Sequence, residues 1–106
     1  MTKHVLYLSG HEEDEVKLLG RRIRMARQRR VLTQSEVAER AGLARATIVA
    51  LESGRAGVSL GALVSVMSAL GLQGKLAGAL ERDDIGEEIE MSSRKRVRKP
   101  DLVADF

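Results

Sequence analysis

Arginine and lysine side chains carry most of the reactive or binding chemistry in this sequence. Residues 16–80 contain eleven of them against three acids, Glu36, Glu39 and Glu52, so this segment has a formal charge of +8. The whole chain of 106 residues carries +3, and the flanking residues therefore contribute −5. A compact basic segment indicates a polyanionic partner, either a nucleic acid or an anionic membrane surface. The alternative is a basic face that is merely solvated.

Groups that serve catalysis or metal binding are scarce. The chain has no Cys, which excludes disulfides, thiolate zinc sites and cysteine nucleophiles. Its two histidines, His4 and His11, lie near the N-terminus, where we expect them to be exposed to solvent rather than bound to a metal. The sequence contains no glycine-rich phosphate-binding loop. We therefore expect a protein that is not an enzyme, with no catalytic residue, no metal and no cofactor.

The length and the apolar pattern predict one small domain with a tail. The aromatic residues are one Tyr and one Phe, so the core must be built from aliphatic side chains. The longest apolar stretch near the N-terminus, residues 5–8, is far too short for a signal peptide or a membrane span. We expect a soluble cytoplasmic protein without a membrane partner, because no amphipathic helix accompanies the basic run near the C-terminus either.

The first half of the chain predicts an arm followed by helices. Residues 1–15 contain a short β-prone run and an acidic cluster, which together suggest a flexible N-terminal arm. From Val16 onward, apolar residues recur at helical spacing and arginines fill the other faces. A capping box over residues 33–36 then opens a second helix, which Gly42 ends. A third helix is expected over about residues 45–53, followed by Gly54.

The second helix, the turn and the third helix form one unit. Val37, Ala38, Ile48 and Leu51 are placed to pack between the two helices. Ala38 allows a close crossing because its side chain is small, and Gly42 suits the unusual backbone angle of the turn. This pattern predicts a helix-turn-helix.

The remainder of the chain is less regular. Ser59 caps a fourth helix whose apolar residues we expect to form one stripe: Leu60, Leu63, Val64, Met67 and Leu70. Residues 72–80 form a short fifth segment. Because it contains glycines, its sequence does not decide between helix and strand. Residues 81–90 hold six acids and residues 94–99 hold five basic residues. We expect the tail, 81–106, to be disordered in the free chain or ordered by a partner, because it has few large apolar residues.

Residues 33–54 resemble the phage-repressor-like (Xre) family of helix-turn-helix proteins. The resemblance covers residues 18–72, and its carriers are the Leu-Thr-Gln run at 32–34, the spacing of the small and apolar residues, and the Leu-Glu-Ser-Gly run at 51–54. It implies an all-α, five-helix domain like that of lambda repressor over residues 16–80. Such domains bind double-stranded operator DNA as two-fold homodimers, with the third helix in the major groove.

The resemblance also assigns roles to residues of this chain. The base-reading face of the third helix would comprise Ala44, Arg45, Ala46, Val49 and Ala50. Arg45 is the main candidate, since a guanidinium can bond both O6 and N7 of guanine. The residues implied in contacts to phosphates are Gln34, Thr47 and Ser53, and Arg29 and Arg30 are either solvated or near phosphates.

Two further positions concern the structure of the domain. Arg27 and Glu52 match the positions of a buried ion pair that joins the first helix to the third. Val31 stands where many relatives carry Gly. Because a β-branched residue resists a positive φ, we expect the first helix to end differently here.

The tails leave the biological role open between two readings. The length of the chain, the order of its segments and its terminal aromatic residue resemble those of HipB-type antitoxins. These proteins pair with a HipA-type kinase toxin and repress their own operon. That resemblance implies dimerisation near residues 72–80 and contact of Leu102, Val103 and Phe106 with the toxin. The alternatives are a stand-alone Xre-family regulator with a solvated tail, or a tail whose residues 94–99 contact phosphates without sequence preference.

Overall fold

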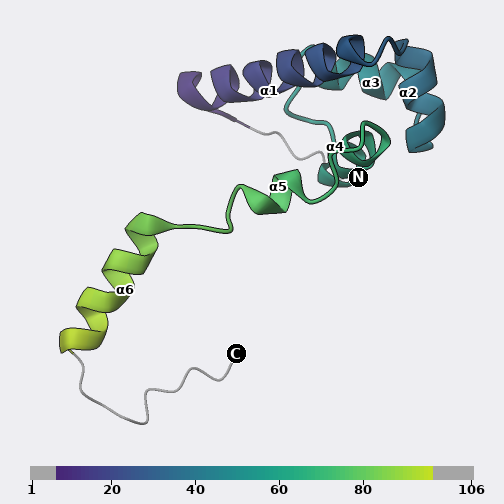
Figure 1. Ribbon diagram of the computed structural model, residues 1–106. Helices are drawn as coiled ribbons and strands as arrows, with labels where there is room; N and C mark the ends of the chain where they lie inside the picture. Colours follow the sequence, from purple (N-terminus) through teal and green to yellow (C-terminus); the bar gives the residue numbers. More distant parts are fainter. Residues whose placement is uncertain (1–6, 97–106) are drawn as a thin grey trace, which may run out of the picture. The chain divides into compact units, whose positions relative to one another are not determined.

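The structure is a computed structural model that describes residues 7–96, which contain six helices and no strand. The helices are α1 (Gly10–Arg29), α2 (Gln34–Ala41), α3 (Arg45–Glu52), α4 (Leu60–Ala69), α5 (Lys75–Gly78) and α6 (Asp84–Arg96). The predicted all-α helix-turn-helix fold is confirmed. The chain divides after Lys75 into two compact units. In the first unit, α2 packs against α3 and α4, while α1 packs against α3 (Figure 1).

Helix α1 begins at Gly10, six residues before the expected start. A capping box fixes this end: the backbone N–H of Glu12 donates to Ser9 Oγ (3.2 Å), and the Ser9 N–H donates to Glu12 Oε1 (2.9 Å). The acidic residues that follow lie in the first turns, where the helix dipole favours negative charge. The prediction of an arm over residues 1–15 is therefore wrong for residues 10–15.

Helix α1 ends with a valine in the left-handed conformation. Val31 has a φ of 55°, its N–H donates to the Gln28 carbonyl (2.9 Å), and the Leu32 N–H donates to the Arg27 carbonyl (3.3 Å). This is the hydrogen-bond pattern that glycine usually completes. The prediction of a different ending is wrong, because the two hydrogen bonds hold the β-branched residue where it would not otherwise settle. The Val31 side chain is 88% exposed, so no neighbour obstructs it.

The helix-turn-helix follows its sequence signals closely. The Thr33 hydroxyl accepts from the Glu36 N–H (3.0 Å), and the Thr33 N–H donates to Glu36 Oε1 (2.8 Å). Gly42 ends α2 with a φ of 68°. The four residues expected to pack between α2 and α3 are all buried: Val37, Ala38, Ile48 and Leu51. Together with Ile23, Ala26, Val66 and Leu70 they form the core.

Gly20 sets the close approach of α1 to α3. A Cβ atom at this position would lie 2.6 Å from the Leu51 carbonyl oxygen and 2.8 Å from that of Glu52. Both neighbours are backbone atoms at the end of α3, so neither can rotate away. The absence of a side chain at Gly20 therefore allows α1 to lie against the last turn of α3.

Helix α4 buries part of the expected stripe. Leu70 is buried and Leu63 packs against the core, whereas Leu60 is 68% and Val64 49% exposed. The prediction is therefore wrong for Leu60 and Val64, and Ala62 and Val66 are buried in their place. Ser59 caps the helix as expected, accepting from the Ala62 N–H.

The second unit contains most of α5 and all of α6. Residues 75–78 form a single helical turn, which decides the question of helix or strand for this segment. The Gly86 N–H donates to Asp83 Oδ1 (3.0 Å) at the start of α6, and Glu90 pairs with Arg94 one turn later. These local interactions give residues 84–96 a helix where the sequence predicted disorder. Residues 97–106 lie outside the described residues, and so do Leu102, Val103 and Phe106.

Candidate nucleic-acid interface

One side of α3 is directed to solvent and the other into the core. Ile48, Leu51 and Glu52 are buried. The candidate base-reading residues on the outward side are Ala44, Arg45, Ala46 and Val49, which are exposed, and Ala50, which is half-buried. Of the candidate phosphate contacts on this helix, Ser53 is exposed and Thr47 is half-buried. Arg45 is the one charged side chain on a surface that is otherwise small and apolar.

A buried ion pair joins α1 to α3. Arg27 donates from Nε to Glu52 Oε2 (2.6 Å) and from Nη2 to Glu52 Oε1 (2.9 Å), and both residues are about nine-tenths buried. Arg27 Nη1 also donates to the Leu32 carbonyl (2.8 Å) in the loop before α2. The hydrogen bonds from Glu52 raise the pKa of the Arg27 guanidinium above its usual value, against the opposing effect of burial. The pair thereby ties α1, the loop and α3 together.

Gln34 extends this pair to the surface. Its Nε2 donates to Glu52 Oε1 (3.2 Å), and its Oε1 accepts from Arg45 Nη2 (3.1 Å). An unbroken series of hydrogen bonds therefore runs from Arg27 through Glu52 and Gln34 to Arg45. Because an amide has a donor and an acceptor end, Gln34 can bridge a carboxylate and a guanidinium in this order. The series fixes the direction of the Arg45 side chain relative to the core.

A shallow basic hollow lies beside this series, at the start of α2. It is lined by Arg24, Arg27, Leu32, Thr33, Gln34, Ser35 and Arg45. Arg27 is already paired with Glu52, so the guanidinium groups of Arg24 and Arg45 and a helix N-terminus are what favour an anion such as a phosphate. The sequence analysis did not select Arg24. The spacing of Arg24 could have indicated this position, because Arg24 precedes Arg27 by about one helical turn and so lies on the same side of α1 as Arg27.

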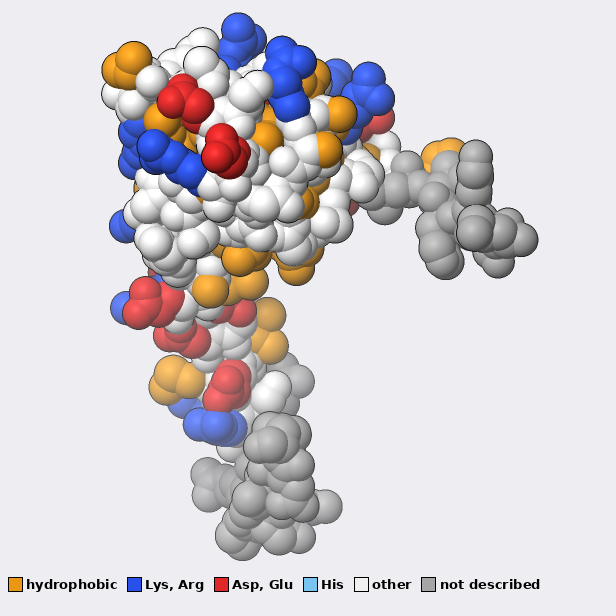
Figure 2. Space-filling view, turned by 90° about the vertical axis from the view of Figure 1, so that its right-hand side faces the viewer, with side chains coloured by type: hydrophobic (Ala, Val, Ile, Leu, Met, Phe, Trp, Pro, Cys, Tyr) orange, Lys and Arg blue, Asp and Glu red, His pale blue; other side chains and the backbone are white. Residues whose placement is uncertain are grey.

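Arg29 and Arg30 lie apart from the hollow, which neither of them lines. Arg30 Nη1 donates to the Ala26 carbonyl (2.8 Å), so its guanidinium caps the end of its own helix. Arg29 is exposed and no hydrogen bond to another described residue holds its side chain. Figure 2 shows Lys and Arg side chains around the first unit, with few acidic ones between them in this view.

The comparisons with known proteins agree with this geometry. Residues 18–80, more than half of the chain, match a family model described as a helix-turn-helix domain. The match runs from within α1 to just beyond α5. A comparison with curated proteins gives no match.

Two other kinds of site were considered in the described part of the chain. Between residues 7 and 96, no three His, Asp or Glu side chains come together in a group able to hold a metal ion. Within the same range, no helix combines the length and the apolar character needed to cross a bilayer.

Proposed function

Since this chain belongs to the family of helix-turn-helix domains of the Xre/Cro type, we propose that it is a transcriptional repressor that binds operator DNA sequence-specifically as a homodimer. The observation that carries the proposal is the hydrogen-bonded series from Arg27 to Arg45, which holds a guanidinium on the outward side of α3. We place the protein at the nucleoid, in the cytoplasm.

In the proposed complex, α3 enters the major groove and Arg45 reads a guanine. A bidentate contact from a guanidinium to O6 and N7 contributes roughly 1–3 kcal/mol of discrimination against other bases. The small side chains of Ala46 and Ala50 contact thymine methyl groups or allow the groove wall to approach. Because Arg45 is the one charged group on this surface, sequence-dependent DNA shape contributes the remaining selectivity.

Contacts to the DNA backbone set the register of α3. The hollow beside Gln34 receives a phosphate between Arg24 and the N-terminus of α2, and Thr47 and Ser53 contact neighbouring phosphates. Such contacts orient the protein without reading sequence. Arg29 adds long-range attraction.

The proposed homodimer places two α3 helices about one helical turn of DNA apart, roughly 34 Å. Residues 72–80 are the expected dimerisation segment, and in this segment the side chain of Leu80 is 83% exposed.

The test is selection of binding sites from a random DNA library, followed by affinity measurements on the selected site. Arg45→Ala is expected to lose discrimination at one guanine position by about 5- to 150-fold, the range that corresponds to 1–3 kcal/mol. Arg40→Ala is the matched control, because Arg40 is an exposed arginine on the neighbouring helix. The same selected sequence for the wild type and Arg45→Ala would contradict the role of Arg45.

We further propose that the protein is the antitoxin of a HipB-like pair that binds a HipA-like kinase toxin and represses its own operon. Support comes from α6, which lies beyond the matched residues 18–80 and divides its charge into an acidic first half and a basic second half. The alternative remains an Xre-family regulator without a toxin partner.

Affinity purification of the full-length protein from its own cells separates these two roles. A stoichiometric protein of kinase fold is expected in the antitoxin case, and deletion of 101–106 is expected to weaken that complex while DNA affinity stays unchanged. Recovery of DNA with no protein partner would favour the stand-alone regulator.

A further inference from the structure

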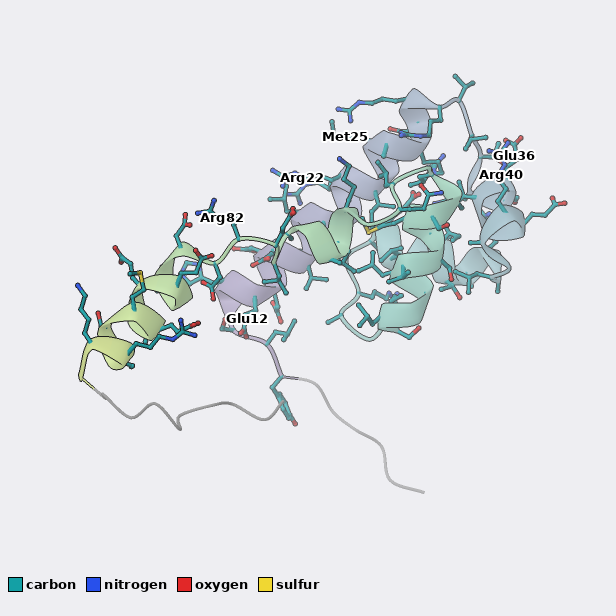
Figure 3. The ribbon with its side chains drawn as sticks, turned by 60° about the horizontal axis from the view of Figure 1, so that its bottom comes forward. Glu12, Arg22, Met25, Glu36, Arg40 and Arg82 are labelled. Carbon is teal, nitrogen blue, oxygen red and sulfur yellow. The ribbon has the colours of Figure 1, made fainter. Side chains whose placement is uncertain are left out.

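The side of α1 opposite the core carries a regular seam of side chains. Its members recur at alternating spacings of four and three residues: His11, Glu15, Leu18, Arg22 and Met25. At 100° per residue they share one face of the helix, and this face lies opposite Gly20, which contacts α3. In Figure 3, Arg22 and Met25 extend from α1 on the side facing away from α4. This alternation is the spacing of a surface that packs against another helix.

The apolar members of the seam lack a partner in the first unit. Met25 is 47% exposed. Leu18 is partly exposed and is not among the residues that pack against the core, unlike its neighbour Leu19. The side chains around Leu18 form a shallow surface depression whose lining includes Asp14, Glu15, Lys17, Arg21 and Arg22.

The charged members of the seam on either side of Leu18 are opposite in sign: Glu15 precedes it and Arg22 follows it, while Lys17 lies off this face of the helix. The ion pairs found among residues 7–96 involve neither Glu15 nor Arg22. Within one helix, side chains pair at separations of three or four residues, whereas Glu15 and Arg22 are seven apart. The parts of the seam before and after Leu18 therefore each present an unpaired charge to solvent.

We propose that this seam binds the same seam of a second copy of the chain, with the two α1 helices antiparallel and Leu18 on the two-fold axis. At a rise of 1.5 Å per residue, Glu15 lies about 4.5 Å and Arg22 about 6 Å along the helix from Leu18, in opposite directions and on the same edge of the seam. The rotation that places Leu18 against itself thus places Glu15 beside the partner's Arg22, and His11 opposite the partner's Met25.

Charge selects this occupant over the other candidates. A parallel pair would set Glu15 against Glu15 and Arg22 against Arg22, which is unfavourable for like charges. DNA would meet the carboxylates of Asp14 and Glu15. Because the seam lies opposite Gly20 on α1, pairing leaves the outward side of α3 accessible, and two DNA-bound assemblies can associate through it.

Cysteine cross-linking tests the arrangement directly, since the natural chain has no Cys. In the full-length protein, Leu18→Cys is expected to give a covalent dimer with a short bis-maleimide reagent. Met25→Cys alone is expected to give none, whereas an equal mixture of His11→Cys and Met25→Cys chains is expected to cross-link. No dimer from Leu18→Cys, or a dimer from Met25→Cys alone, overturns the antiparallel pair.

Charge reversal provides the second measurement, by sedimentation of the full-length protein over a range of concentrations. Glu15→Arg and Arg22→Glu are each expected to weaken self-association through this seam by about tenfold or more. The double variant, which restores opposite charges across the axis, is expected to return to within about threefold of the wild type. Failure of this rescue overturns the proposal.

Glu13→Arg is the matched control, because it makes the same change of charge in the same turn of α1 but off the seam. An effect as large as that of Glu15→Arg would attribute the association to net charge and overturn the specific pairing. No measurement here involves DNA, so the result stands apart from the proposed regulator.

Discussion

Replacement of Gly20 by alanine tests whether the approach of α1 to α3 is as close as the structure has it. The added Cβ would lie 2.6 Å from the Leu51 carbonyl oxygen, about 0.8 Å short of ordinary contact. Since that atom belongs to the backbone, the two helices must move apart. Overpacking of this kind costs typically 1–3 kcal/mol, while alanine regains about 0.5–1 kcal/mol over glycine within a helix. Because the blocking atom is backbone, the cost should lie in the upper part of that range, about 2–3 kcal/mol, and we expect a net loss of about 1–2 kcal/mol in the free energy of unfolding.

Urea denaturation followed by circular dichroism measures this loss. With a denaturant slope of about 1–3 kcal/mol/M for a small protein, the midpoint should fall by roughly 0.5–1 M. Gly61→Ala is the matched control: Gly61 lies within α4, a Cβ there meets nothing within 4 Å, and we expect a gain of about 0.5–1 kcal/mol. A Gly20→Ala variant that is as stable as the wild type would refute the close contact.

Three other changes are predicted. Val31→Gly should raise the free energy of unfolding by about 0.5–1 kcal/mol in the same urea assay. The left-handed conformation costs valine about 1–2 kcal/mol, which exceeds the extra conformational entropy that glycine loses on folding. A loss of stability would contradict this. Arg27→Met should lower the free energy of unfolding by about 3–5 kcal/mol, because it leaves the charge of Glu52 buried and unpaired. The double variant, Arg27→Met with Glu52→Leu, should lose less, and a double-mutant cycle measures the difference. The hydrogen bond from the Thr33 N–H lowers the pKa of Glu36 in the folded protein. The wild type should therefore be more stable than Glu36→Gln at any pH above about 4.3, the pKa of Glu in the unfolded chain, and this difference should vanish as the pH falls through the lower pKa of the folded protein. A difference in stability that persists in acid would contradict this.

The local signals in the sequence predicted the helix-turn-helix because each one acts over three or four residues. Thr33 and Glu36 cap α2, and Gly42 ends it, with no help from distant parts of the chain. The same kind of signal, Ser9 with Glu12, marks the start of α1, but the nearby β-prone run and acidic cluster led to the prediction of an arm. This boundary could therefore have been predicted from the sequence.

Other features depend on packing between helices and could not be read from spacing alone. In α4, both the row through Leu60 and Val64 and the row through Ala62 and Val66 have helical periodicity. The structure buries the row that fits against α2, and helical periodicity cannot tell which one that is. The conformation of Val31 is likewise decided by hydrogen bonds to α1 that outweigh the preference of the residue.

Arg45, the candidate base-reading residue, is linked by hydrogen bonds to the buried ion pair of Arg27 and Glu52. A buried ion pair is a weak source of stability, since apolar residues of similar size often serve as well. The Arg27 and Glu52 pair does something that apolar residues cannot do, because Glu52 also accepts from Gln34, which in turn orients Arg45. An apolar replacement of the pair that preserved stability would leave Gln34 Nε2 without this acceptor. Selectivity at the guanine position should then fall even though the domain remains folded, which separates the role of the pair in recognition from its role in folding.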